Sequence, residues 1–278
     1  MSDFGPEMPP FTELAPGVRR MVAPNPSMMT GPGTNTYLFG TSEIAVLDPG
    51  PHIPEHLAAI REKAGGDIRW ILATHSHPDH SPGVAALAEA TGAEVLGMPA
   101  PNAAHHDLTF VPGRALAHGD RLEAPEFELE AIHTPGHASN HLCFRHIATN
   151  WLFTGDHVID GSTVVINPPD GNMNHYLESL EKVKALQTAA LLPGHGEKID
   201  KPDEVIDWII KHRLEREAKV LAAVKEHPQL TTRELVPYVY ADVPEKLYSW
   251  AERSLQAHLI KLEDDLATTM ETGRWKIL

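Results

Sequence analysis

The chain has 278 residues, 42% of them hydrophobic, which is enough for one large domain or two ordinary ones with a full core. A formal net charge of −15 argues against binding a polyanion over a broad surface, although it does not exclude a local basic groove. The single cysteine, Cys143, the lack of a signal-peptide pattern in the first ten residues and the absence of a membrane-length apolar run together favour a cytoplasmic protein with no membrane partner.

The first 200 residues alternate short apolar runs with amphipathic segments, which predicts layers of sheet and helix. Ser81 and Pro82 are typical of a helix start, as N-cap and first helical residue. In chain order we expect an arm over residues 1–34 with a strand at 18–22; strands at 36–39 and 44–47; a helix at 54–63; a buried strand at 68–74; a helix from Ser81 to about residue 90; strands at 94–97, 127–133, 141–146 and 151–154; a helix at 174–186; and a short strand at 191–192.

The tail after about residue 201 has little glycine and is dominated by helical periodicity. We expect a long helix at 205–224, with a break near Arg213 as an alternative, a helix at 231–238 whose Thr-Thr-Arg-Glu start is close to a capping box, a second long helix at 243–266, and a hairpin at 268–278. This order predicts a winged-helix-like domain at 201–278 behind a catalytic domain at 1–200.

The charge balance of the tail does not favour nucleic-acid binding. From Arg216 onward the sequence has nine Lys or Arg against ten Asp or Glu, so it lacks a basic footprint. Structural support, a cleft wall or a homodimer contact is the favoured role. A basic track formed by Arg213, Arg216 and Lys219 on one helix face remains an alternative.

The histidines cluster in a way that points to a metal site. The predicted strand at 68–74 leads directly into His-Ser-His-Pro-Asp-His, so His75, His77, Asp79 and His80 lie together in a loop at a strand end. Alternate residues at a strand end point the same way, so the first two histidines can face one ion. The turn into the following helix can aim the other two residues at a second ion.

Three later motifs each follow an apolar strand and contain a glycine that allows a tight turn. His137 lies in His-Thr-Pro-Gly-His, Asp156 in Thr-Gly-Asp, and His195 in Pro-Gly-His-Gly. Five imidazoles and two carboxylates form a donor set that suits zinc best, with iron or manganese possible. The pattern predicts one site assembled from several strand ends, with two zinc ions per chain.

The motifs HSHPDH, TPGHA, TGD and PGHG resemble, in order and context, the ligand series of the metallo-β-lactamase fold superfamily. The segments GPGTNTYLFG and YLESL and the winged-helix-like tail are most similar to the lactamase-β-like subfamily, which includes a mitochondrial endoribonuclease that acts on single-stranded RNA. The resemblance implies an αββα sandwich. It also implies that His75, His77 and His137 hold the first metal, that Asp79, His80 and His195 hold the second, and that Asp156 bridges the two.

Two departures narrow the function. β-Lactamases of the superfamily generally lack an aspartate at the position of Asp156, so β-lactam hydrolysis is expected only as a minor activity. Transfer-RNA 3′-processing members have a glycine where this chain has Pro78. Asp79 is the candidate catalytic residue, because it can bind metal and also handle a proton. His133, His141, His157 and Tyr176 are expected to support the ligands or to contact substrate.

The sequence leaves the substrate open. A hydrolase that uses a metal-bridging hydroxide on a small ester, thioester or lactone is favoured by the acidic balance, with a small molecule as its partner. Endonucleolytic cleavage of single-stranded RNA is favoured by the subfamily resemblance. A non-catalytic metal-binding module and an iron enzyme such as a sulfur-handling dioxygenase are further alternatives; the full ligand set argues against the former.

Overall fold

The computed structural model describes residues 8–278, so the part of the expected arm and leader region at 1–7 lies outside the described residues. The described chain forms two compact units. The first comprises residues up to Thr134, Asn140–Ser162 and Leu186–Pro202, and the second comprises Pro135–Ser139, Thr163–Ala185 and Asp203–Leu278. Over residues 8–278, each helix is too short or too polar to cross a bilayer. The proposed domain limits at residue 200 stay a prediction.

The first unit contains a seven-stranded sheet in which strand pairing changes from antiparallel to parallel at β4. Its first four strands form an antiparallel meander, whereas β4, β5, β6 and β7 run parallel. Helices α1 (Pro54–Ala64) and α2 (Gly83–Thr91) supply the crossovers that parallel strands require. The strands, in sheet order, are β1 (Phe11–Ala15), β2 (Val18–Val22), β3 (Asn35–Phe39), β4 (Glu43–Leu47), β5 (Asp67–Leu72), β6 (Glu94–Gly97) and β7 (Arg114–Ala115).

A five-stranded sheet completes the sandwich. Strands β11 and β12 are parallel, with Phe153 opposite Leu192, so the carboxyl ends of these two strands meet at one edge. The other neighbouring pairs are antiparallel. In sheet order the strands are β12 (Ala190–Pro193), β11 (Trp151–Gly155), β10 (Leu142–His146), β9 (Glu128–His133) and β8 (Arg121–Glu123).

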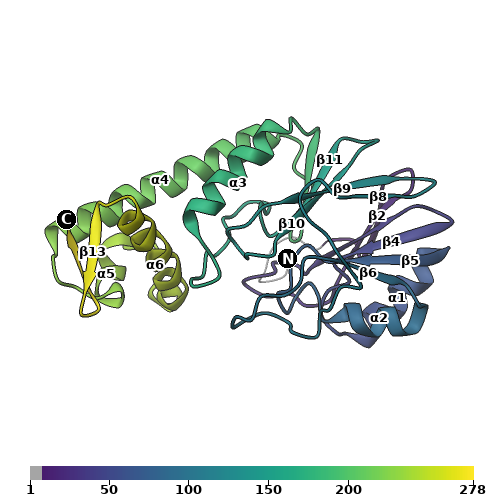
Figure 1. Ribbon diagram of the computed structural model, residues 1–278, viewed down its shortest axis with the longest axis horizontal. Coiled ribbons are helices and arrows are strands. Elements are labelled where there is room, and N and C mark those ends of the chain that lie inside the picture. The colour runs from purple at the N-terminus through teal and green to yellow at the C-terminus, as the bar shows by residue number, and fades with distance from the viewer. Residues whose placement is uncertain (1–7) are drawn as a thin grey trace. The chain divides into compact units, whose positions relative to one another are not determined.

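Two apolar layers hold the first unit together, one between the sheets and one beneath α1 and α2. Figure 1 shows these two helices side by side, next to β5 and β6. Between the sheets, Phe153 of β11 meets Tyr37 and Phe39 of β3 edge-on, with ring centroids 4.7 Å apart in each pair. On the outer face of the seven-stranded sheet, buried side chains of α1 and α2 such as Ile60 and Leu87 pack on the sheet. The strands are thus rigid enough to hold functional loops at their carboxyl ends.

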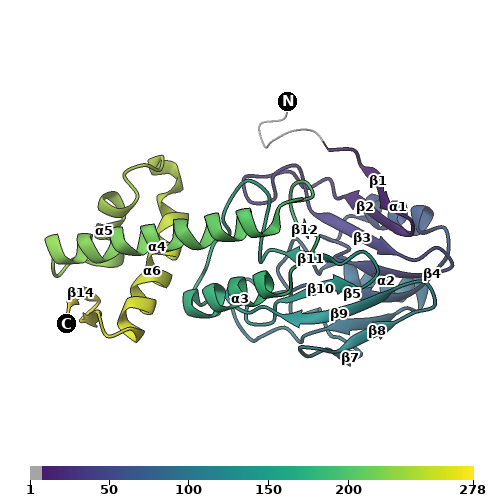
Figure 2. The same cartoon turned by 90° about the horizontal axis from the view of Figure 1, so that it is seen from above.

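The second unit contains α3 (Met173–Ala185) and the long helix α4 (Pro202–Glu226), followed by a winged helix. Figure 2 shows α5, α6 and the hairpin gathered beside α4. Their shared core includes Val220, Leu255 and Trp275. The winged-helix elements are α5 (Thr232–Val239), the 3₁₀ turn η1 (Glu245–Leu247), α6 (Tyr248–Asp264), β13 (Thr268–Glu271) and β14 (Arg274–Ile277).

The structure corrects several predicted boundaries. Pro82, not Ser81, is the N-cap of α2, because the Ser81 hydroxyl donates to Asp107 at 2.8 Å instead of capping the helix. Helix α4 continues through Arg213 without the interruption considered above. The 3₁₀ turn η1 precedes α6, where one continuous helix was expected. Strands β1, β7 and β8 were not predicted. The capping box at Thr231 is confirmed.

We predict that Phe153→Ala lowers the free energy of unfolding by about 3–5 kcal/mol, because it removes a fully buried ring and leaves a cavity between the sheets. The measurement is urea denaturation followed by circular dichroism. Phe11→Ala is the matched control: that ring is 38% exposed on a sheet-edge strand, so its loss should be small. Equal destabilisation by the two variants would contradict the assignment of the core.

Candidate metal centre

The loop that follows β5 begins the site. Asp48 follows β4 and Thr74 follows β5, and because these strands are parallel their carboxyl ends lie side by side. His75, His77 and His80 then leave the same edge of the sheet, with His75 and His80 buried. The buried apolar strand thus explains why these polar side chains are held rigidly at its end.

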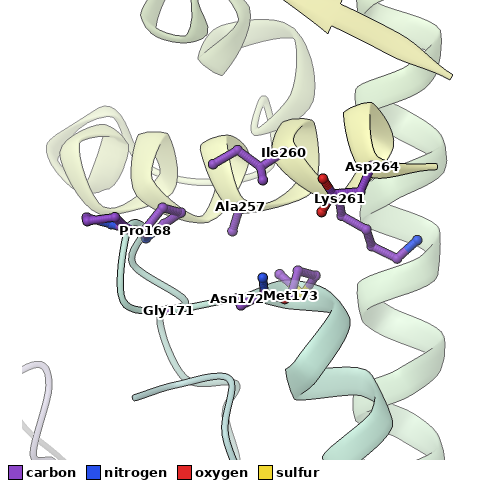
Figure 3. A pocket seen from close by; sticks show the side chains of 9 residues that line it. Pro168, Gly171, Asn172, Met173, Ala257, Ile260, Lys261 and Asp264 are labelled. Carbon is purple, nitrogen blue, oxygen red and sulfur yellow. The ribbon is translucent and has the colours of Figure 1, made fainter. Parts of the chain in front are cut away.

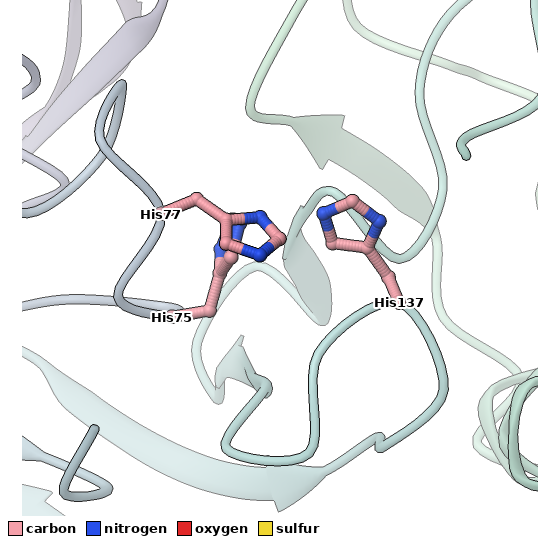
Figure 4. A group of neighbouring side chains, drawn as sticks. All are labelled: His75, His77 and His137. Atoms are coloured by element: carbon pink, nitrogen blue, oxygen red, sulfur yellow. The ribbon is translucent and has the colours of Figure 1, made fainter. Parts of the chain in front are cut away.

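The structure brings the seven predicted ligands into two groups, in each of which one ligand atom per residue lies within 4.8 Å of the others. In the first group, the imidazole of His137 faces those of His75 and His77 (Figure 4). The rings of His75 and His80 are 4.3 Å apart, so the groups are neighbours. The second group contains Asp79, His80, Asp156 and His195.

Distances in the second group match a shared ion. Asp156 Oδ1 lies 3.3 Å from both His80 Nε2 and His195 Nε2, and Asp79 Oδ2 lies 3.2 Å from His195 Nε2. A tetrahedral zinc ion with bonds of ~2.0–2.1 Å places its ligand atoms ~3.3 Å apart. Within residues 8–278 the two imidazole Nε2 atoms are buried and make no hydrogen bond. Their lone pairs and these carboxylate oxygens therefore fit a metal ion.

Each of four buried rings is oriented through its Nδ1 atom. His137 Nδ1 donates to the carbonyl oxygen of Val165 at 2.8 Å, and His195 Nδ1 donates to that of Gly33 at 3.2 Å. His80 Nδ1 lies 2.9 Å from an oxygen of Asp48. An acceptor at Nδ1 fixes the tautomer in which Nε2 is free to bind a metal.

Asp48 and Thr74 extend this arrangement to His75. The Asp48 carboxylate is 2% exposed and accepts from the Thr74 backbone N–H at 2.7 Å and from the Thr74 hydroxyl at 2.8 Å. Because that hydroxyl has donated its only proton, it must accept from His75 Nδ1, 3.0 Å away. Nε2 of His75 then faces Nδ1 of His77 at 2.9 Å.

The turn after β12 leaves no space for a side chain at Gly194. A Cβ atom there would lie 2.7 Å from His80 Cε1 and 2.9 Å from Asp156 Oδ1. The same turn is held by Asn35, whose side-chain amide donates to the carbonyl oxygens of Pro193 and Gly196, each at 2.9 Å. Glycine is therefore needed for the backbone to approach the ligands, and Asn35 fixes the turn that carries His195.

Electrostatics favour a cation in the second group. Burial would raise the pKa of Asp156, but the adjacent His195 and His80 outweigh it and hold the pKa far below its usual range. Burial likewise opposes ionisation of Asp79, yet His80 and His195 lower its pKa to about 2. Burial lowers the pKa of His195, but Asp156 and Asp79 raise it to about 9. Both carboxylates are thus ionised, and a divalent ion would replace the protons on the histidines.

His75 differs from His80 in charge. Burial, together with coulombic repulsion from the neighbouring imidazoles of His80, His77 and His141, keeps the pKa of His75 well below its ordinary value. Burial also acts to lower the pKa of His80, but Asp79, Asp156 and Asp48 together raise it well above that value. A metal ligand must present a lone pair. A neutral His75 can do so without first losing a proton.

The predicted supporting residues have distinct places. Among residues 8–278, none of the four belongs to either ligand group. His141 is buried, and its Nε2 accepts from the Asp156 backbone N–H at 3.2 Å. His157 is buried with its ring 6.1 Å from that of His141, and His133 ends β9 partly buried. Tyr176 is fully buried in α3, so no part of its side chain is open to solvent. Their functional roles stay predictions.

Sequence reasoning missed Asp48 and His106. Asp48 follows the strand β4 as part of Asp-Pro-Gly, and its position at a strand end was the available signal. His106 is in no motif identified from the sequence, but its Nδ1 lies 2.7 Å from Ser76 Oγ and its ring centroid lies 4.9 Å from that of His77. The contacts of His106 arise from the tertiary path of the loop at 98–113, which the sequence does not show.

Two segments next to the ligands carry exposed apolar side chains. Gly33, which accepts from His195, ends a segment whose Met28 and Met29 are 62% and 43% exposed. The segment of His106 carries Leu108 and Val111, which are 60% and 73% exposed. We refer to these four side chains as the apolar rim. The apolar rim thus belongs to segments that contact the ligands through Gly33 and His106, which suits a substrate with an apolar part.

Comparison with known proteins agrees with this geometry. Residues 29–195 match the family model described as the metallo-beta-lactamase superfamily, and residues 231–275 match a beta-lactamase associated winged helix domain. The chain is 32% identical to a Drosophila melanogaster protein named beta-lactamase-like protein 2 homolog, over 93% of this chain and 91% of that one.

Two further matches concern function and fold. The chain is 30% identical to an atrochrysone carboxyl ACP thioesterase of Passalora fulva, over 84% of this chain and 71% of that one. A crystal structure of a metallo-beta-lactamase family protein from Thermus thermophilus superposes with a TM-score of 0.81 at 21% identity, covering 96% of this chain and all of that one. This likeness shows the sandwich fold, as predicted.

We predict that Asp48→Asn weakens binding of one metal ion by ~10–100-fold, the range typical of partners that orient metal ligands. An amide N–H facing His80 Nδ1 would favour the tautomer that carries its proton on Nε2. Zinc affinity of the metal-free protein is measured by competition with a chromophoric chelator. Asp67→Asn, at an exposed position far along β5 from the loop, is the control. Wild-type affinity in the Asp48 variant would contradict the role given to this carboxylate.

Proposed function

The chain belongs to the metallo-beta-lactamase superfamily, and on that premise we propose that it is a dinuclear-zinc hydrolase of a small acyl ester, thioester or lactone. The proposal is supported by the two ligand groups, whose atoms have the number, burial and spacing that two adjacent ions need. We also propose a cytoplasmic location, a small-molecule substrate as the partner, and a possible homodimer.

His75, His77 and His137 would hold the first ion, Asp79, His80 and His195 the second, and Asp156 would contact both. When bound, two such ions would supply a hydroxide at neutral pH and would polarise the scissile carbonyl. Iron or manganese could serve in place of zinc. Asp79 is the most accessible carboxylate of the group, with a side chain 27% exposed, so it is placed to accept the proton of the attacking water.

The charge of the segments around the site is the observation that carries the choice of substrate. Segments 24–33, 75–83, 98–113, 134–141 and 156–172 carry six of the seven ligands, some of their partners or the apolar rim, and none of these segments contains Lys or Arg. The turn that carries His195 contains Lys198, which is paired with Asp200. A polyanion bound along these segments would have no cationic side chain to neutralise its phosphates. An uncharged acyl group needs none, and the apolar rim can bind it.

The structure removes the basic track that would have favoured RNA. Arg213 and Arg216 are 3% and 7% exposed, because the first donates to the Val164 carbonyl oxygen and the second to the Val239 carbonyl oxygen and to Asp242. Of the three residues proposed for that track, only Lys219 has an exposed side chain, and it too is paired with Asp242. Reversing the charge of the two arginines would therefore test folding instead of RNA binding.

A named relative supports the acyl reading. The Passalora fulva protein is described as a thioesterase that acts on an acyl group carried by ACP, and it aligns with 84% of this chain. Thioester hydrolysis yields a carboxylic acid and a thiol, and it requires water activation together with stabilisation of an oxyanion. Both are tasks that the proposed pair of ions performs.

We predict two transition-metal ions per chain, mainly zinc, after reconstitution of the metal-free protein. The reason is that seven donors in two neighbouring groups exceed what one tetrahedral ion can use. The measurement is elemental analysis together with protein quantification. His195→Ala should retain the ion of the first group, which serves as an internal control. One ion or none in the wild type would exclude the dinuclear assignment.

We predict that the zinc-loaded protein hydrolyses at least one uncharged acyl thioester, ester or lactone at a rate nearly independent of salt. Binding of single-stranded RNA should be weak at physiological salt and should fall by ~0.7 log units per log unit of salt for each neutralised phosphate. The assay compares these substrates and a β-lactam at low and physiological salt, with the Asp156→Ala variant as the inactive control. Efficient metal-dependent RNA cleavage at physiological salt, without acyl turnover, would make the ribonuclease reading correct.

A further inference from the structure

The loop Pro135–Ser139, which carries His137, belongs to the second unit and is hydrogen-bonded there to α3 and to the segment 163–172. The Pro135 carbonyl oxygen accepts from Ser179 Oγ at 2.9 Å, and the Gly136 carbonyl oxygen accepts from the Asn172 backbone N–H at 2.8 Å. Beyond the ring itself, the Ser139 N–H donates to Asp170 at 2.9 Å. The orientation of this imidazole is therefore set by α3 and by the segment 163–172.

Gly136 packs so closely against α3 that no side chain would fit between this loop and the helix. Its φ is +139°, and a Cβ atom there would lie 2.4–2.5 Å from the N, Cα and Cβ atoms of Tyr176. The loop thus rests directly on the first turns of the helix. A shift of Tyr176 or of the segment 163–172 must be transmitted to the His137 ring, because no flexible side chain lies between them.

Arg213 of α4 contacts both the segment 163–172 and α3. It is 3% exposed, its guanidinium donates to the carbonyl oxygen of Val164, and its Cζ lies 5.5 Å from the centroid of the Tyr176 ring. The next residue after Val164 is Val165, whose carbonyl oxygen accepts from His137 Nδ1 at 2.8 Å. One buried cation therefore fixes the peptide segment that aims the imidazole.

A cavity beside the segment 163–172 makes the hydrogen bond from Arg213 more important for the position of that segment. A hollow of about 190 Å³ lies beside the end of the segment, lined by Pro168, Gly171 and Met173 on one side and by Ala257 and Ile260 of α6 on the other (Figure 3). Packing around residues 168–173 is incomplete, so van der Waals contact restrains that end of the segment less than a filled core would. Its position depends correspondingly more on the hydrogen bonds made at its two ends.

We propose that Arg213 is a positioning residue for the metal centre, acting through Val164 and Val165 on His137. The inference rests on the proposed function in that it takes His137 to be a metal ligand. Arg213 lies beyond residue 195, where the match to the superfamily model ends. The long helix of the C-terminal region would thereby contribute to catalysis without touching substrate or metal.

The test compares Arg213→Met with Arg216→Met in the full chain. Arg216 is the matched control: it lies on the same helix and is also buried, but it donates to the Val239 carbonyl oxygen and to Asp242, which do not contact the His137 loop. Chelator competition measures zinc affinity at both sites. Nitrogen-15 NMR of the metal-free protein measures the solvent exchange of the His137 Nδ1 proton.

For Arg213→Met we expect one of the two zinc affinities to fall about tenfold, at the low end of the range for groups that orient ligands, with faster exchange of the His137 proton. Arg213→Lys should recover most of both effects, because an ammonium can still donate to the carbonyl. Arg216→Met should change neither, even if it lowers thermal stability.

Wild-type zinc affinity and proton exchange in Arg213→Met would overturn the proposal, as would equal effects in Arg216→Met. If Arg213→Met does not fold, Arg213→Gln is measured by the same criteria. Failure of both to fold while Arg216→Met folds would assign Arg213 to stability alone and reject the positioning role. Because these readouts need no substrate, wild-type protein that binds two ions but turns over no acyl compound would refute only the substrate assignment.

Discussion

Each of four buried imidazoles points its Nδ1 atom at a group that can act only as a hydrogen-bond acceptor, and the chemistry of the centre depends on this constraint. A peptide carbonyl oxygen can only accept, and the Thr74 hydroxyl has already given its proton to Asp48. In its neutral form, each ring must therefore carry its proton on Nδ1 and its lone pair on Nε2. The acceptors are Thr74 Oγ1 for His75, Asp48 for His80, Val165 O for His137 and Gly33 O for His195.

This arrangement is unfavourable for Asp48 in two respects, its backbone conformation and its burial. Its φ of 50° lies in the left-handed region, where a non-glycine residue is strained by about 1–3 kcal/mol. Its carboxylate is buried, so each oxygen needs a hydrogen-bond donor in place of the water that it has lost. Thr74 and His80 provide those donors, and they do so only because β4 and β5 run parallel and end together.

The order of the elements and the ligand positions could be predicted because they depend on local pattern. A buried apolar strand followed by polar residues is visible in the sequence, and so are the winged-helix order and the Thr231 capping box. The contacts that orient the ligands could not be predicted in this way. His195 and Gly33 are 162 residues apart, and Thr74 and Asp48 are 26 apart, so no local window contains both partners.

The same limit explains the errors. Ser81 has the residue type of an N-cap, but tertiary contact with Asp107 takes its hydroxyl away from the helix. A helix face bearing Arg213, Arg216 and Lys219 looks solvated in a sequence, because burial of an arginine depends on whether a distant carbonyl or carboxylate meets it. Very short strands such as β7 and β8 carry too few residues to show periodicity.

The hydrogen bond from His195 to Gly33 also bears on how the protein acquires its metal. During synthesis the ribosome releases Gly33 long before His195, and the turn that carries the histidine also needs Asn35. The second group therefore cannot assemble on a nascent chain until β12 has emerged and joined its sheet. An unfolded chain offers no preformed site, so capture of the proposed ions would belong to the end of folding, and the ions would then contribute to the stability of the finished fold.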